Sequence, residues 1–283
     1  MEKEALGSFT ELNSNFREDW HPSAVKVTRR PLPMNELYDV FFEIKCLLYL
    51  HHDNILHMYG YNLSETNAGV MIQMVTELCD GSLDDVIQHM KACSEPCEAD
   101  EFLRRLHKYI DIGTQICSGL RYIHTAGYLH RDLKLENILV KGHIIKISDV
   151  GLAKPQHLTT GTYTGTPLYI APEVMFCQYN PKSTAVDIYS MGFILWELWY
   201  GRRVEEDPAY QGLWFDLRSF VAKGGRPTLT RRRKPMQSLV DIIQTCWNQN
   251  PEFRPDAETV LNKLCEVETS IDDYISDGKF DTC

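Results

Sequence analysis

The sequence predicts an α+β protein in which a small, strand-rich lobe precedes a larger, mainly helical lobe. Short runs rich in valine, isoleucine and threonine occur within the first 80 residues, whereas a long helical stripe of apolar residues begins near residue 100. The length of 283 residues suits one large domain or two closely joined lobes. We expect the lobes at residues 1–79 and 80–265, followed by an acidic and flexible tail at residues 266–283.

The first lobe should hold strands around one helix. Residues 23–28 (SAVKVT) and 70–77 (VMIQMVTE) have the composition and length of strands. Between them, residues 35–50 place apolar side chains at helical spacing from Leu37 onward, and the prolines at positions 31 and 33 oppose an earlier start.

The second lobe should be built on helices. Apolar residues recur at steps of three and four through residues 100–124, and further helices are expected from residue 183 onward. Residues 137–140 and 143–147 read as two short strands joined by a turn at Lys141-Gly142. The most apolar stretch, residues 188–200, contains Glu197 and is shorter than the about 20 residues of a membrane span, so it predicts a core helix.

Charge and cysteine content narrow the classes of function. The 29 Lys and Arg residues against 39 Asp and Glu residues give a net charge of -10, so nothing favours binding to nucleic acid. The 9 cysteines are an odd number in a chain much larger than disulfide-stapled scaffolds, so we expect reduced thiols and a cytoplasmic location. The acidic start, MEKEALGSFT, does not read as a signal peptide.

Three short motifs follow one another in the second lobe. Residues 128–140 read YLHRDLKLENILV, Asp149-Val150-Gly151 follows an isoleucine-rich strand, and Ala171-Pro172-Glu173 comes next. In this order they resemble the protein kinase family, whose signatures are H-R-D-L-x-x-x-N, D-F-G and A-P-E. The resemblance runs from about residue 5 to residue 265. It implies the bilobal protein kinase fold and ATP-dependent phosphoryl transfer to protein substrates.

Phosphoryl transfer requires an oriented acceptor hydroxyl, a triphosphate held in line and neutralisation of its developing charge. The resemblance implies that Asp132 orients the acceptor or accepts its proton, and that Lys134 helps to hold the transferred group. It also implies that Asn137 and Asp149 supply oxygen ligands to Mg2+. The alternative for Asp132 and Asn137 is a capped turn between a helix and a strand.

Lys26 stands where the family carries the lysine that binds the α and β phosphates. Glu43 is the expected partner on the following helix, and Glu36 is the competing candidate. The alternative for Lys26 is a surface lysine on an edge strand.

Further residues are assigned to the nucleotide by the same resemblance. Gly7 matches the middle glycine of the loop that covers the phosphates, although Ala5 and Thr10 replace the other two glycines. Thr76 takes the gatekeeper position before the hinge, which is Glu77-Leu78-Cys79. The residues expected around the adenine are Ala24, Glu77, Cys79 and Leu139. The alternative for the hinge is a buried strand end, and both descriptions can hold together.

Two departures keep other functions open. The missing loop glycines and Val150 in place of phenylalanine would suit a catalytically weak pseudokinase that acts as a signalling scaffold. The retained charged residues favour an active enzyme.

The acceptor is expected to be serine or threonine, because Lys134 and Gly165-Thr166 resemble the serine/threonine pattern. The run NPEFRP at residues 250–255 is similar to the tyrosine-kinase-like group, in which Arg254 would pair with Glu173. The segments GTPLYIAPE and GLWFDLRSFVAKGGRP are similar to serine/threonine and tyrosine kinases related to the receptor-interacting kinases, so dual specificity is an alternative.

Arg131, before the catalytic aspartate, indicates an activation segment that is ordered by phosphate. We expect an upstream kinase to act on one of the hydroxyls Thr159, Thr160, Thr162, Tyr163 or Thr164. A hydroxyl-rich surface loop without such a switch is the alternative. Asp187 resembles the buried aspartate that tethers the backbone of the catalytic loop.

Overall fold

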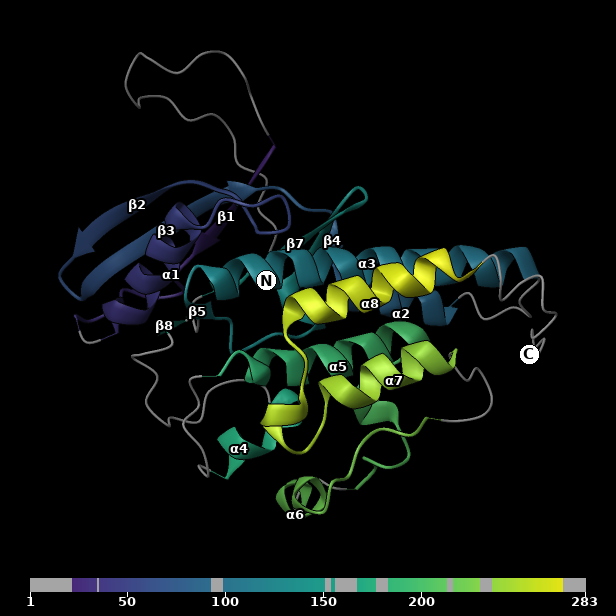
Figure 1. Ribbon diagram of the computed structural model, residues 1–283. Coiled ribbons are helices and arrows are strands. Elements are labelled where there is room, and N and C mark those ends of the chain that lie inside the picture. Colours follow the sequence, from purple (N-terminus) through teal and green to yellow (C-terminus); the bar gives the residue numbers. More distant parts are fainter. Residues whose placement is uncertain are drawn as a thin grey trace.

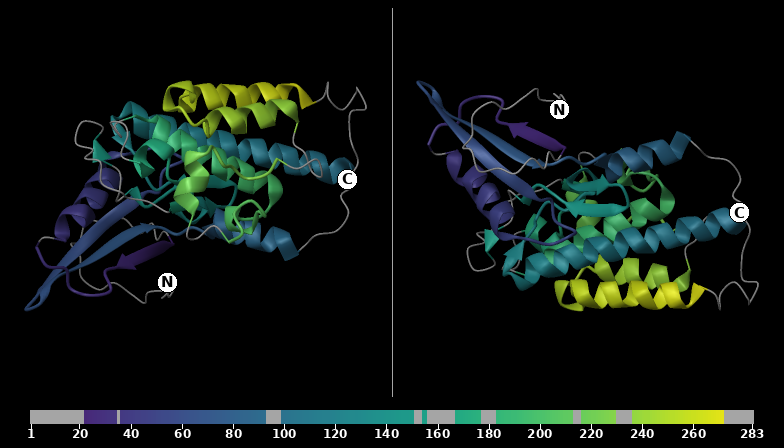
Figure 2. Two further views of the ribbon diagram at one scale, coloured as in Figure 1. Left: turned by 90° about the horizontal axis from the view of Figure 1, so that it is seen from below. Right: turned by 90° about the horizontal axis from the view of Figure 1, so that it is seen from above.

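The computed structural model describes residues 22–34, 36–92, 99–150, 154–155, 167–176, 183–212, 216–229 and 236–271. Gathered at one end of the molecule is an antiparallel sheet with the strand order β1-β3-β2, with helix α1 beside it (Figure 1). Its elements are β1 (Ser23–Val27), α1 (Leu37–Tyr49), β2 (Met58–Thr66) and β3 (Gly69–Glu77). Both views in Figure 2 show the helical part at the other end. The predicted α+β architecture, a sheet-rich lobe followed by a helical lobe, is confirmed.

The second lobe begins with the short strand β4 (Gly81–Ser82) and the helices α2 (Leu83–Ala92) and α3 (Ala99–Thr125). The elements that carry the motifs are β5 (Tyr128–Leu129), the 3-10 helix η1 (Leu135–Asn137), β6 (Ile138–Lys141), β7 (Ile144–Ile147) and β8 (Lys154–Pro155). The five short strands of this region form two small sheets, with the strand orders β4-β6-β7 and β5-β8. The motif HRDLKLEN therefore lies between α3 and the β6–β7 hairpin.

The remaining elements include one long buried helix, α5 (Ala185–Tyr200), in which every side chain except that of Trp199 is buried. The others are η4 (Pro167–Tyr169), α4 (Pro172–Met175), η5 (Val204–Glu206), α6 (Leu217–Ala222), α7 (Gln237–Cys246), η7 (Pro251–Phe253) and α8 (Ala257–Thr269). Of these, α7, η4 and η7 contact α5. The prediction of a core helix at residues 188–200 is confirmed. Within the described residues, no helix has both the length and the apolar character needed to cross a membrane.

The structure corrects two boundaries. The β6–β7 register pairs Lys141 with Ile144, so the turn is Gly142-His143 rather than Lys141-Gly142. Gly142 has a φ of 61°, which glycine adopts readily. Residues 266–271 do not belong to the predicted flexible tail, because α8 continues through Thr269 and Ile271 is only 1% exposed; residues 272–283 lie outside the described part of the chain.

Two of the longer elements were not expected from the sequence. Strand β2 reads MYGYNLSET and lies at the edge of the sheet, where most of its side chains are exposed, so it lacks an alternating apolar pattern. Helix α2 had a local signal that was overlooked. Ser82 Oγ accepts from the backbone N–H of Asp85 at 3.2 Å, and Asp85 Oδ2 accepts from the Ser82 backbone N–H at 2.7 Å, which is a capping box.

Candidate active site

Lys26 in β1 joins two carboxylates from distant parts of the chain. Its Nζ lies 2.8 Å from Glu43 Oε1 on α1 and 3.3 Å from Asp149 Oδ1, which follows β7. Glu36, the competing partner, instead binds Arg30 Nη2 at 2.7 Å. The structure therefore brings Lys26 together with Glu43 and Asp149, as the resemblance implied.

The charges of these groups depend on one another. Burial alone would lower the pKa of the Lys26 ammonium, but the charges of Glu43 and Asp149 outweigh that effect, and the pKa is raised from 10.5. For Glu43 burial dominates and raises the pKa from 4.5, because Lys26 only partly offsets it. Lys26 is thus held as a cation, and its side chain is 54% exposed, so an anionic ligand can reach it.

Asp132 is oriented by two neighbours in the catalytic loop. Lys134 Nζ lies 2.9 Å from Asp132 Oδ2. Asn137 Nδ2 donates to Asp132 Oδ2 at 3.0 Å and to the Asp132 carbonyl oxygen at 2.8 Å. These contacts place a carboxylate beside a cation in a fixed direction, as the alignment of an acceptor hydroxyl requires. Since Asn137 uses its amide nitrogen here, its Oδ1 is the atom left for a ligand.

The backbone before Asp132 is held by a buried carboxylate on α5. Asp187 accepts from the backbone N–H of His130 at 2.9 Å and from that of Arg131 at 2.7 Å, and it lies 2.8 Å from His124 Nε2. Burial alone would raise the pKa of Asp187, but the bond from His124 and the other donors outweigh it, so the pKa is lowered from 3.8. The predicted tether is confirmed, and it holds Arg131 at the uncommon φ of 69°.

The backbone segments that carry Asp149 and Asn137 are joined by a hydrogen bond. Ser148, which precedes Asp149, donates its backbone N–H to the Asn137 carbonyl oxygen at 2.8 Å. Asp149 has a φ of 57° and a side chain that is 46% exposed, whereas Val150 is fully buried in the core. Val150 is therefore a core residue, while the preceding carboxylate of Asp149 is accessible. One carboxylate, one amide oxygen and the oxygens of a bound phosphate are a donor set that fits a divalent cation.

The residues predicted around the adenine lie close to the junction of the two lobes. Ala24 is opposite Thr76 in the β1–β3 ladder, and Glu77 ends β3. Cys79 follows and is half-buried, as is Leu139 in β6. Their contacts to a nucleotide stay a prediction.

Glu77 has an additional role that sequence reasoning missed. Its side-chain carboxylate lies 2.8 Å from Lys141 Nζ and 2.9 Å from Lys146 Nζ, and it accepts from the His57 backbone N–H at 2.9 Å. Burial alone would raise the pKa of Glu77, but these donors lower it from 4.5. The carboxylate thus ties the end of β3 to the β6–β7 hairpin. The sequence did offer one signal for this contact, because Lys141 and Lys146 stand in an otherwise apolar hairpin and need an acidic partner.

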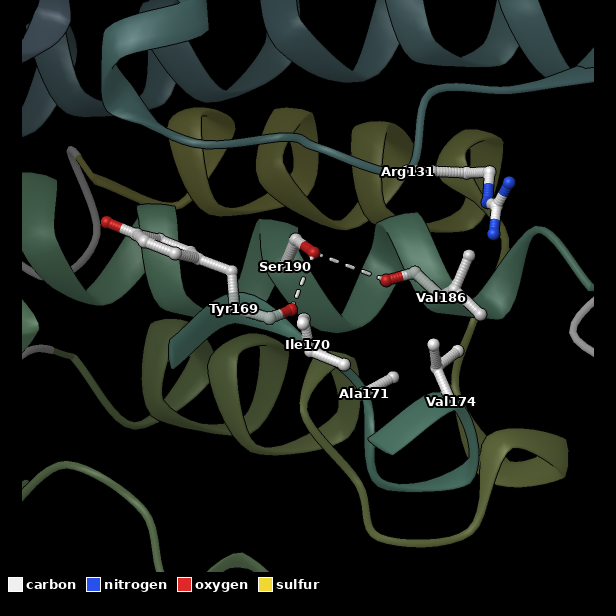
Figure 3. A pocket seen from close by; sticks show the side chains of 7 residues that line it. All are labelled: Arg131, Tyr169, Ile170, Ala171, Val174, Val186 and Ser190. Carbon is white, nitrogen blue, oxygen red and sulfur yellow. Dashed lines mark hydrogen bonds between the residues drawn. The ribbon is translucent and has the colours of Figure 1, made fainter. Parts of the chain in front are cut away.

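The segment around Ala171-Pro172-Glu173 is held by contacts with α5 and with Arg254. A small cavity of about 20 Å³ is lined by Arg131, Tyr169 and Ser190 among others, and Figure 3 shows their side chains. The Ser190 hydroxyl donates to the Tyr169 carbonyl oxygen at 3.0 Å, which ties this segment to α5. The predicted pair of Glu173 and Arg254 is also present, with N–O distances of 2.6 and 2.8 Å.

Several predicted residues lie outside the described part of the chain. They are Gly7, Thr166 and the five hydroxyl residues Thr159, Thr160, Thr162, Tyr163 and Thr164.

A lysine held between two carboxylates, together with an oriented aspartate beside a second lysine, has the groups that phosphoryl transfer requires. Comparison with known families agrees, since the model of the protein kinase domain matches residues 7–264. The chain belongs to the protein kinase family.

Similar proteins have related names. The dual specificity protein kinase shkD of Dictyostelium discoideum is 30% identical over 86% of this chain and 31% of its own length. A dual serine/threonine and tyrosine protein kinase of Tetraodon nigroviridis is 29% identical over 76% of this chain and 23% of its own length. A probable serine/threonine-protein kinase of Dictyostelium discoideum is 33% identical over 80% of this chain and 16% of its own length. The chain thus spans less than a third of each of these relatives.

Proposed function

We propose that this chain transfers the γ-phosphoryl group of ATP to serine and threonine hydroxyls of protein substrates. The observation that carries the proposal is the convergence of Lys26 with Glu43 and Asp149, at a site where Lys134 and Asn137 also orient Asp132.

Each residue has a distinct task in this reaction. Lys26 binds the α and β phosphates as a point charge, and Glu43 keeps its ammonium directed into the site. Asp132 orients the acceptor hydroxyl and takes its proton, while Lys134 stabilises the negative charge on the transferred group. Ala24, Leu139 and the hinge at Glu77 and Cys79 enclose the adenine.

Magnesium is the divalent ion that we propose for this site. Asp149 and Asn137 would hold it, because Mg2+ prefers few protein oxygens together with substrate phosphates. When bound, it supplies positive charge against the phosphate oxygens.

The test measures transfer of labelled phosphate from ATP to a generic protein substrate. Wild type should be active, whereas D132N and K26M should lose activity by a factor on the order of 100 or more. K45M is the matched control, because Lys45 is an exposed lysine on α1, and it should keep the wild-type rate. Equal background in all four proteins would favour the scaffold alternative.

Dual specificity is the second candidate, and the names of the relatives favour it. Phosphoamino acid analysis of the same labelled product separates the two candidates. Phosphotyrosine that disappears in D132N would support transfer to tyrosine as well.

Activation by an upstream kinase is also part of the proposal. Arg131 lies beside the segment at Tyr169, where a guanidinium can pair with a phosphate group. Replacing the four threonines by alanine and Tyr163 by phenylalanine should lower substrate phosphorylation. An unchanged rate would contradict this switch.

We further propose a cytoplasmic location, in a reducing compartment. The buried free thiols of Cys46, Cys117 and Cys246 support it. Imaging of the tagged chain in cells is the direct test.

A further inference from the structure

Arg203, which follows α5, is surrounded by carboxylates from separate elements. Its Nη2 lies 2.6 Å from Glu136 Oε1 in η1, and its Nη1 binds Asp84 in the first turn of α2. Its Nε lies 3.6 Å from Glu205 Oε2 and 4.0 Å from Glu197 Oε1. The side chains of Arg203 and Asp84 are 18% and 15% exposed, so this pair interacts with little screening by water, whereas the side chain of Glu136 is 39% exposed.

The contact with Glu136 matters because of where this residue stands. Glu136 lies in η1, between Leu135, which is fully buried, and Asn137, which binds Asp132. Lys134, which also binds Asp132, comes immediately before η1. The same short turn is thus held by Arg203 through Glu136 and presents the neighbours of the catalytic carboxylate.

We propose that Arg203 is a positioning residue for phosphoryl transfer, which acts by holding Glu136 and thereby the turn that presents Asn137 and Lys134 to Asp132. The inference rests on the proposed function. A guanidinium can bind two carboxylates at once through its planar fork, which a lysine ammonium does not reproduce. Without it, the carboxylates of Glu136 and Asp84 lose the positive charge that they share, and the turn loses its fixed position.

The test compares R203M and R203K with wild type, and R202M is the matched control. Arg202 is the adjacent residue and also binds a buried carboxylate, since its Nη2 lies 2.8 Å from Asp207 Oδ2. The measured quantities are kcat, the KM values for ATP and a peptide substrate, and the melting temperature.

We expect R203M and R203K to lower kcat about tenfold or more while KM for ATP changes less than about threefold, because the loss concerns alignment rather than nucleotide binding. R202M should lower the melting temperature and keep kcat within about twofold of wild type. If Arg203 has a purely structural role, R203M and R203K should instead lower the melting temperature and leave kcat unchanged.

A double-mutant cycle tests the route through Glu136. If Arg203 acts through this residue, E136Q/R203M should have the same kcat as E136Q within about twofold, whereas independent effects would multiply. Multiplying losses, or an unchanged kcat in R203M with an active wild type, would overturn this inference alone. An inactive wild type would refute the proposed function, and the inference would fall with it.

Discussion

The pair of Glu173 and Arg254 provides the sharpest test of how the activation region is anchored. The Arg254 side chain is fully buried and binds both carboxylate oxygens of Glu173. Arg254 also donates to the carbonyl oxygens of Ala185 at 3.0 Å and Asn248 at 2.8 Å, and it lies 4.9 Å from the centre of the Tyr189 ring. We predict that E173Q, which keeps the shape but removes the charge, strongly destabilises the protein.

The magnitude follows from the burial. Removing one partner of a buried ion pair leaves an uncompensated charge and costs about 3–5 kcal/mol. The bonds from Arg254 to the carbonyl oxygens remain, so we expect the lower end, about 3 kcal/mol. Since 1 kcal/mol shifts the melting temperature of a domain of this size by about 2–4 °C, the expected decrease is on the order of 10 °C.

Urea unfolding and thermal melting measure this effect, and E258Q is the matched control. Glu258 lies 3.4 Å from Arg121 Nη1, but the two side chains are 60% and 47% exposed. Exposed pairs contribute about 0–1 kcal/mol, so E258Q should change the melting temperature by no more than about 3 °C. Equal effects of E173Q and E258Q would refute the argument that burial sets the size of the loss.

Three further predictions concern other groups. The pKa of Glu197 is raised from 4.5 to about 8 by burial, so the folded state keeps a proton that the unfolded state loses. The free energy of unfolding should therefore fall between pH 5 and pH 8, by up to about 1.4 kcal/mol per pH unit, and urea titrations of E197Q should show a smaller fall. The pKa of Glu77 is lowered, so its ionised form adds stability above pH 4.5 that is lost on acidification. E77Q should be about 1–3 kcal/mol less stable at neutral pH, and its difference from wild type should shrink below pH 4.5. A Cβ at Gly119 would lie 2.8 Å from the Asn54 carbonyl oxygen, whereas one at Gly60 meets no atom of the described residues within 4 Å. In urea unfolding G119A should cost about 1–3 kcal/mol and G60A less than about 0.5 kcal/mol.

The sequence allowed prediction of those site residues that belong to motifs. Asp132, Asn137 and Asp149 stand at fixed positions in short signatures, so their assignment needed no knowledge of distance. Glu43 was preferred to Glu36 already from its position in the sequence, and the ion pairs that the two residues form with Lys26 and Arg30 confirm that choice.

Other contacts were hidden because they join residues without a shared motif. Arg203 and Glu136 are 67 positions apart, and Glu77 and Lys141 are 64 apart, so no local pattern connects either pair. Strand β2 was missed for a different reason, because an edge strand with mostly exposed side chains has no alternating apolar signal.

Asp187 links the deepest part of the molecule to its most reactive part. Its helix, α5, is almost entirely buried, while its carboxylate accepts hydrogen bonds from the backbone N–H groups of His130 and Arg131, which precede Asp132. Substitutions of apolar residues in α5, which lie away from the residues proposed to bind phosphate, should therefore change the turnover number. The catalytic rate of this chain thus depends on how its interior is packed.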